Sequence, residues 1–150
     1  MKKIVMLMPF LLLMLTAFAP ETATTEIAII VNKENTVDKL STGEVKLYWL
    51  RKIKKRWPDI NKNIKPADRK SKCAEQDTFY SSVLGMSASD VETYFTQKQY
   101  ESAEKPQDKF TSDAGIIDFV ANEPGAIGFV NASSLTAEAK ASVKVVLVIK

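Results

Sequence analysis

The sequence has no histidine and a single cysteine, Cys73, among its 150 residues. A single cysteine excludes a disulfide within the chain, and the absence of histidine excludes the Ser-His and Cys-His pairs of nucleophilic catalysis. The two absences also leave no Cys/His cluster of the kind that holds zinc. Catalysis would have to come from carboxylates and lysines, and no carboxylate pair has a spacing that indicates acid–base work. We therefore expect a protein that is not an enzyme, without catalytic residues, metal ligands or a cofactor.

The N-terminal segment has the three parts of a secretory signal peptide. Lys2-Lys3 precede a largely apolar run over residues 4–18, and Ala17-Phe18-Ala19 supplies a small-x-small cleavage signal. A retained membrane anchor is the alternative, but the run is short for a bilayer and Pro9 interrupts it. The sequence therefore predicts that residues 1–19 are cleaved and that the protein is periplasmic or secreted.

The rest of the chain has almost no charge excess. The whole sequence has 21 Lys and Arg and 18 Asp and Glu, and residues 1–19 contain two lysines and no acid. Residues 20–150 therefore carry 19 cations and 18 acids, a net charge of +1. Nucleic-acid-binding proteins usually carry a larger cationic excess, so no nucleic-acid partner is expected. The length of residues 20–150 suits a single domain.

Short apolar runs alternate with amphipathic segments along this domain. The apolar run over residues 27–31 is rich in β-branched residues and predicts a buried strand. Further strands are expected over residues 64–67, 126–130 and 143–149, the last of them buried. Helices are expected after the capping boxes Ser41–Glu44 and Ser89–Glu92, over residues 72–84, and from Ser112-Asp113 onward. This alternation is typical of a single α/β domain.

Two glycines near residue 125 predict local backbone geometry. Pro124-Gly125 has the composition of the centre of a type II turn, in which the glycine takes a positive φ. Gly128 lies inside the predicted strand that follows, which predicts that another backbone or a ligand passes close to it.

Three cations crowd the predicted start of the helix over residues 72–84. They are Arg69, Lys70 and Lys72, although a helix N-terminus carries a partial positive charge. With Ser71 as the N-cap, an oxyanion such as phosphate or sulfate would accept from the first helical N–H groups, the Ser71 hydroxyl and a bidentate Arg69. The alternative is a solvated turn, in which each lysine extends into water at a cost of only tenths of a kcal/mol.

Cys73 lies near the same predicted helix start. Neighbouring cations and a helix N-terminus lower a thiol pKa and make the cysteine reactive. The commoner alternative is a buried cysteine that does not react.

A second cationic run covers residues 51–56, next to Trp57. Such a run can bind the phosphates of nucleic acid or an anionic surface. The alternative, a solvated face balanced by acids elsewhere, agrees better with the net charge of +1.

Several segments in order resemble one protein family. Residues 27–85, from IAIIVNKEN to FYSSVLG, resemble the phosphate-type periplasmic substrate-binding proteins of ABC transporters. Residues 123–130, EPGAIGFV, are similar to that family's pGAIGYv segment, and the match extends from Ile27 to Asn131. The resemblance implies a type II periplasmic-binding fold, in which two α/β lobes close on an oxyanion. The chain has about half of the family's usual length, so the expected fold is one such lobe, a mixed sheet flanked by helices.

The resemblance also implies binding residues. The family's ligand segment has an arginine followed by Ser-Gly-Thr, which corresponds here to Arg69 and Ser71, with Lys72 and Cys73 in place of Gly-Thr. The implied anion-binding residues are therefore Arg69, Ser71, Lys72 and Cys73. The chain also departs from the family at Arg51, where a glycine is usual.

We therefore expect an exported substrate-binding-protein-like domain that recognises phosphate or a related oxyanion and is associated with ABC-type phosphate uptake. The alternative is an interaction module of the cell envelope that keeps the fold but not the ligand. The candidate partners, besides the oxyanion, are an ABC transporter permease, another envelope protein, or a second copy of the chain.

Overall fold

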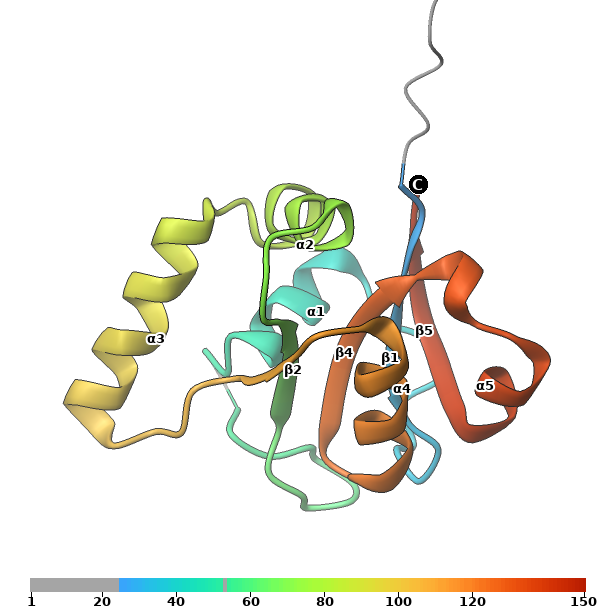
Figure 1. The fold of residues 1–150 in the computed structure, drawn as a ribbon. Helices are drawn as coiled ribbons and strands as arrows, with labels where there is room; N and C mark the ends of the chain where they lie inside the picture. The colour runs from blue at the N-terminus through green and yellow to red at the C-terminus, as the bar shows by residue number, and fades with distance from the viewer. Residues whose placement is uncertain (1–24, 53) are drawn as a thin grey trace, which may run out of the picture.

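The computed structural model describes residues 25–52 and 54–150 and has a mixed sheet with helices against both faces (Figure 1). The five strands are β1 (Ile27–Asn32), β2 (Lys65–Arg69), β3 (Asp108–Phe110), β4 (Ala126–Asn131) and β5 (Val143–Ile149). Their order in the sheet is β3-β2-β4-β1-β5. β2 is parallel to β3 and β4, whereas β1 is antiparallel to β4 and β5. The predicted α/β class, a mixed sheet flanked by helices, is confirmed.

The predicted signal peptide, residues 1–19, lies outside the described residues. Within residues 25–52 and 54–150, no helix is both long and apolar enough to cross a membrane.

Two groups of helices cover the two faces of the sheet. One face packs against α1 (Thr42–Trp49), α2 (Ala74–Phe79) with the π-helical turn Tyr80–Leu84 that continues it, and α3 (Ala88–Ser102). The other face packs against α4 (Asp113–Asn122) and α5 (Ala137–Ser142). Every residue of β1 is buried, because this central strand lies between both groups. A strand buried on both faces needs a continuous apolar run, which explains the pattern of residues 27–31.

The strand predictions hold in the middle of the sheet and weaken at its edges. β1 and β4 form where the apolar runs predicted them, and β2 lies slightly later than the predicted residues 64–67. β5 was expected to be buried, but it is the edge strand next to β1, and its Val148 is 43% exposed. β3 has three residues and no apolar pattern, so the sequence did not indicate it.

Capping boxes start two of the helices. The predicted box of α1 is present: Glu44 N–H donates to Ser41 Oγ over 3.2 Å, and Ser41 N–H donates to Glu44 Oε2 over 2.8 Å. The box of α3 is formed by Ser87 and Asp90 instead of the predicted Ser89–Glu92. Both pairs have the required spacing, and the earlier pair adds residues to the helix N-terminus.

The two glycines near residue 125 are explained by close packing. The predicted type II turn at Pro124-Gly125 is wrong, because that turn requires a positive φ at Gly125. Among the described glycines, Gly85 is the one with a positive φ, of 61°. Gly125 is required since a Cβ there would lie 1.9 Å from the carbonyl oxygen of Asn63. At Gly128 the predicted close approach is present, but the neighbour is a side chain: a Cβ would lie 2.7 Å from Cγ2 of Ile116 in α4. Helix α4 therefore packs directly on β4.

Arg51 has a backbone conformation that glycine would adopt more easily. Its φ is 51°, in the left-handed region, which costs a residue with a Cβ about 1 kcal/mol or more. This is the position at which the resembling family usually has glycine.

We predict opposite effects of alanine at two glycines. Gly125→Ala forces the Asn63 backbone away and should lower the free energy of unfolding by roughly 1–3 kcal/mol. Gly43→Ala in α1 is the matched control, because a Cβ there has no atom within 4 Å, so stability should be unchanged or higher by up to about 1 kcal/mol. Urea unfolding of the two variants measures both effects. Equal stability of Gly125→Ala and the wild type would contradict the packing of residue 63 on residue 125.

Candidate functional site

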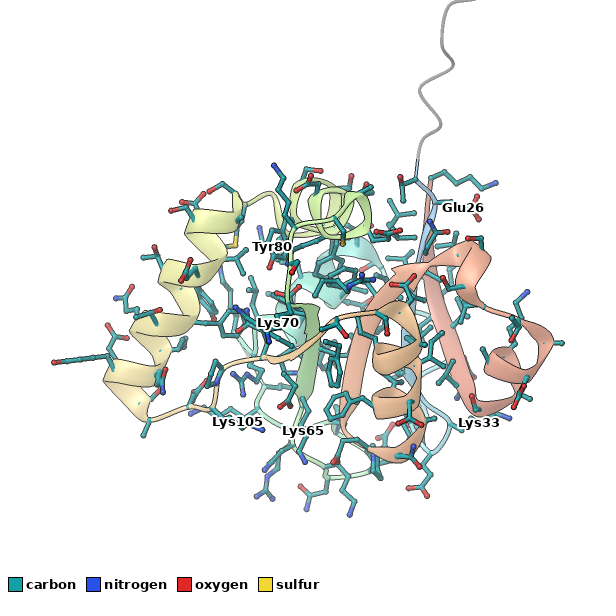
Figure 2. All side chains as sticks on the ribbon, viewed as in Figure 1. Glu26, Lys33, Lys65, Lys70, Tyr80 and Lys105 are labelled. Carbon is teal, nitrogen blue, oxygen red and sulfur yellow. The ribbon has the colours of Figure 1, made fainter. Side chains whose placement is uncertain are left out.

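The carboxyl ends of three parallel strands meet on one side of the sheet. β2 ends at Arg69, β3 at Phe110 and β4 at Asn131, and the N-terminus of α4 lies beside them; we call this region the carboxyl edge. Lys70 N–H donates to the Phe110 carbonyl over 2.8 Å and so continues the pairing to the end of β3. Figure 2 shows Lys70 at this end of β2 and Lys65 at the opposite end. Ligands of α/β proteins usually bind at such an edge.

Arg69 is held at the carboxyl edge by an internal ion pair. Its Nη1 donates to Oδ1 of Asp113, the first residue of α4, and its Nη2 donates to the Thr111 carbonyl over 3.2 Å. The two charged side chains are only 17% and 13% exposed. The guanidinium therefore already has a counter-anion supplied by the chain.

The Asp113 carboxylate connects several elements. Its Oδ2 accepts from the backbone N–H of Asn131 over 2.9 Å and from the Ser134 hydroxyl over 2.7 Å. Ser112 caps the same helix, since its Oγ accepts from the N–H of Gly115 over 3.1 Å. A carboxylate in the first turn also interacts favourably with the helix dipole. One side chain thus links β2, β4 and α4.

A second carboxylate, Asp68, lies fully buried directly before Arg69. It accepts hydrogen bonds from the Tyr80 hydroxyl, from the side-chain amides of Gln76 (3.1 Å) and Gln107 (3.3 Å), and from the Arg69 N–H (2.7 Å). Burial raises the pKa of the Tyr80 hydroxyl most, and the Asp68 charge raises it further. The hydroxyl therefore keeps its proton and remains a hydrogen-bond donor. Sequence reasoning missed this network because its members are spread over 39 residues of sequence.

The residues between β2 and α2 are arranged differently from the prediction. The helix begins at Ala74 with Cys73 as its N-cap, so the prediction that Ser71 caps it was wrong. The cause is tertiary: Lys70 still pairs with β3, and Gln76 Nε2 donates to the Arg69 carbonyl over 3.0 Å, which fixes where the first turn lies. Ser71 and Lys72 are exposed as a result.

Cys73 is half-buried and lies near Glu75 at the carboxyl edge. Burial raises the pKa of its thiol, and the hydrogen bond to Glu75 acts in the same direction, whereas the backbone N–H of Gln76 and the Arg69 charge lower it by less. Burial also acts to raise the pKa of Glu75, but hydrogen bonds from its own N–H, from Asn131 and from Cys73 outweigh it, so the Glu75 pKa is lowered. The structure favours the unreactive alternative for the cysteine.

The cationic run 51–56 is largely engaged with neighbouring segments. Lys55 pairs with Glu104 over 2.6 Å, and Arg56 donates to the Asn63 side chain over 3.0 Å. Trp57 beside it is buried, and its indole N–H donates to the Gly125 carbonyl over 2.9 Å. These contacts fit the solvated, charge-balanced alternative better than a continuous phosphate-binding patch.

Among the described residues, no group of three or more Cys, Asp or Glu side chains is arranged to hold a metal ion.

No protein-family model matches the chain, and no curated protein matches it. Solved structures do. A protein from Clostridium perfringens, described as a phosphate ABC transporter substrate-binding protein with bound phosphate, matches 82% of this chain with a TM-score of 0.58 and 21% identity. An ABC-type phosphate transport receptor from Vibrio cholerae matches 80% of this chain with a TM-score of 0.60 and 19% identity. PstS from Borrelia burgdorferi also matches 80% of it, with a TM-score of 0.59 and 13% identity. The fold is that of phosphate substrate-binding proteins.

The resemblance drawn from the sequence is thus confirmed at the level of the fold. The chain spans 45%, 44% and 46% of the three proteins, less than half of each. The division into residues 1–19 and a single lobe over residues 20–150 stays a prediction. So do the anion-binding roles of Arg69, Ser71, Lys72 and Cys73.

We predict that Asp113→Ala destabilises the protein by roughly 2–3 kcal/mol, because it leaves the half-buried Arg69 without a counter-charge and the Asn131 N–H without an acceptor. Asp118→Ala is the matched control in the same helix, where the exposed carboxylate accepts from Asn122, and it should change stability by about 0.5 kcal/mol or less. Urea unfolding compares the two. Similar losses in both variants would contradict the linking role of Asp113.

We predict that Cys73 is alkylated slowly in the folded protein. Its raised pKa leaves less thiolate near pH 8 than an ordinary cysteine has, and thiolate is the reacting form. Iodoacetamide should therefore modify the native protein more slowly than the urea-unfolded chain, as followed by mass spectrometry. Faster reaction of the native protein would revive the reactive alternative.

Proposed function

We propose that the protein is an exported substrate-binding-protein-like domain that recognises phosphate or a related oxyanion at the carboxyl edge, in association with ABC-type phosphate uptake. The observation that carries the proposal is the position of Arg69, a guanidinium fixed at the carboxyl end of a central parallel strand. The fold supports it, because solved proteins with this fold are described as phosphate-binding.

Arg69 is pre-organised for an anion. Its ion pair with Asp113 and its bond to the Thr111 carbonyl fix the side chain, so little rotamer entropy remains to be lost on binding. Beside it, Lys70 and Lys72 are exposed, and Lys72 lies 4.0 Å from Asp77, a surface pair that contributes little. An incoming oxyanion would accept from the exposed part of Arg69, from the Ser71 hydroxyl and from Lys72. Cys73 would line the inner side of the site.

The proposed binding is weak and sensitive to salt. The carboxyl edge is open on the side of residues 70–72, so hydration and counter-ions compete for each contact. Asp113 also cancels part of the Arg69 charge. The proposed partner is an ABC transporter permease. The proposal includes no catalytic step.

The second candidate is an envelope interaction module that keeps the fold without the ligand. The contacts of Asp113 favour it, because Arg69, Asn131 and Ser134 already have polar partners within the chain. A site that is complete without an anion gains less from binding one. The partner in that case is another envelope protein or a second copy of the chain.

We predict that phosphate stabilises the protein in low-salt buffer. A ligand at about 100 times its Kd adds ~2.7 kcal/mol, which raises the Tm of a domain of this size by several degrees. Thermal unfolding with phosphate, sulfate and chloride measures the effect. The phosphate-dependent rise should disappear in Arg69→Ala and shrink in Ser71→Ala and Lys72→Ala. Lys33→Ala, which removes an exposed cation away from the carboxyl edge, is the control and should respond like the wild type.

One result would decide against the first candidate. A rise with phosphate no larger than with chloride would reject anion recognition and favour the interaction module. Because Arg69→Ala leaves Asp113 unpaired and can itself destabilise the fold, the exposed Ser71 and Lys72 variants carry the test if that protein does not fold.

A further inference from the structure

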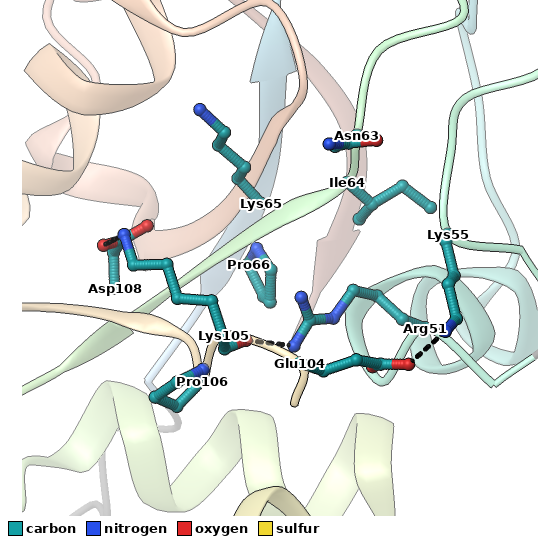
Figure 3. Close-up of a pocket in the computed structure, with 10 residues that line it drawn as sticks. All are labelled: Arg51, Lys55, Asn63, Ile64, Lys65, Pro66, Glu104, Lys105, Pro106 and Asp108. Atoms are coloured by element: carbon teal, nitrogen blue, oxygen red, sulfur yellow. Dashed lines mark hydrogen bonds and ion pairs between the residues drawn. The ribbon is translucent and has the colours of Figure 1, made fainter. Parts of the chain in front are cut away.

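A cavity of about 280 Å³, lined by charged and apolar groups, lies at the opposite end of β2 from the carboxyl edge (Figure 3). Three segments line it: Arg51 and Lys55 after α1, residues 63–66 at the start of β2, and residues 104–106 with Asp108 at the start of β3. The volume exceeds the roughly 30 Å³ that a water molecule occupies by several-fold and approaches the lower limit of small-molecule sites. The cavity has room for a small organic molecule.

The charged groups in the walls of this cavity include more cations than carboxylates. Four cations and two carboxylates line it. Lys55 pairs with Glu104 over 2.6 Å, and Lys105 pairs with Asp108 over 2.9 Å. Lys65 is balanced by Glu123, outside the lining, over 2.8 Å. The three lysines therefore each have a carboxylate partner.

Arg51 is the remaining cation, and it forms no ion pair with any described residue. Its Nη2 donates to the Lys105 carbonyl over 2.6 Å, while its Nε is buried without a hydrogen-bond partner. The guanidinium stacks over the Phe95 ring at 5.8 Å from the centroid and points toward the space between Pro66 and Lys105 in Figure 3. Among its five donors, Nε is thus the buried one without an acceptor, and the buried Glu104 oxygens in the same wall have no hydrogen-bond partner among the described residues besides the Lys55 ion pair.

The backbone at Arg51 supports a functional reading of this side chain. Its φ of 51° is strained for a residue with a Cβ, and strained residues cluster at binding sites.

Glu104, whose side chain is only 10% exposed, stays ionised in the same wall, since the Lys55 hydrogen bond lowers its pKa and Arg51 acts in the same direction. An anion bound in the cavity would therefore share the Arg51 charge with Glu104.

We propose that this cavity is a second ligand site, which binds a small organic anion with its carboxylate or phosphate group on the Arg51 guanidinium. A planar guanidinium fork matches both anionic groups. Pro66 and Pro106 supply apolar contact for the rest of the molecule. This site is separate from the carboxyl edge and does not depend on phosphate recognition there.

Arg51→Gly is the variant that tests the site. It removes the guanidinium, and it also relieves the strained φ, so the variant is expected to fold. The neighbouring exposed cation gives the matched control, Lys52→Ala. Thermal unfolding of the wild type and both variants is measured with malonate, with glycerol 3-phosphate, with inorganic phosphate and with chloride. Malonate and glycerol 3-phosphate separate a carboxylate ligand from an organic phosphate.

We expect at least one of the two organic anions to raise the Tm of the wild type and of Lys52→Ala by several degrees in a saturable way, and to leave that of Arg51→Gly unchanged. In NMR spectra of the wild type, the same anion should shift the Nε–Hε signal of Arg51. That signal is assigned by its absence from the spectrum of Arg51→Gly. Arg69→Ala should keep this response, which separates it from recognition at the carboxyl edge. No rise beyond chloride with either organic anion, or an equal rise in Arg51→Gly, would overturn the proposal.

Discussion

The Asp113 carboxylate is the contact on which the carboxyl edge depends. One of its oxygens pairs with Arg69 at the end of β2, and the other accepts from the N–H of Asn131 at the end of β4 and from the Ser134 hydroxyl. Because the group is only 13% exposed, these bonds are shielded from water and hold the strand ends in register with the helix. The same contact both fixes the arginine for an incoming anion and cancels part of its charge. If the edge recognises an oxyanion as proposed, this double role predicts that the binding is weak.

Behind this contact lies the buried Asp68, whose bonds to Gln76, Tyr80 and Gln107 join α2, the turn that follows it and the segment before β3. A buried carboxylate without a cation is tolerated only when its oxygens are well supplied with donors, and here four donors reach them. The network holds the end of β2 rigid. The loop over residues 70–72 lies outside it and is exposed.

Much of the fold could be predicted because its signals are local. The β-branched runs of β1 and β4 and the capping box at Ser41 depend on neighbouring residues alone, and they were placed correctly. The start of α2 could not be placed from Ser71, because tertiary contacts of the Gln76 side chain with Asp68 and Arg69 in β2 set it. The pairing of Arg69 with Asp113 was missed for the same reason. These residues are 44 positions apart, and an aspartate after a serine indicates only a helix start.

The central claim, that the carboxyl edge recognises an oxyanion, is tested most directly by following backbone amide signals in ¹H–¹⁵N NMR spectra during a phosphate titration at low salt. The account predicts saturable shifts confined to residues 69–73, 111–114 and 131, with smaller shifts in a chloride titration. No shift beyond chloride, or shifts confined to other parts of the chain, would contradict it.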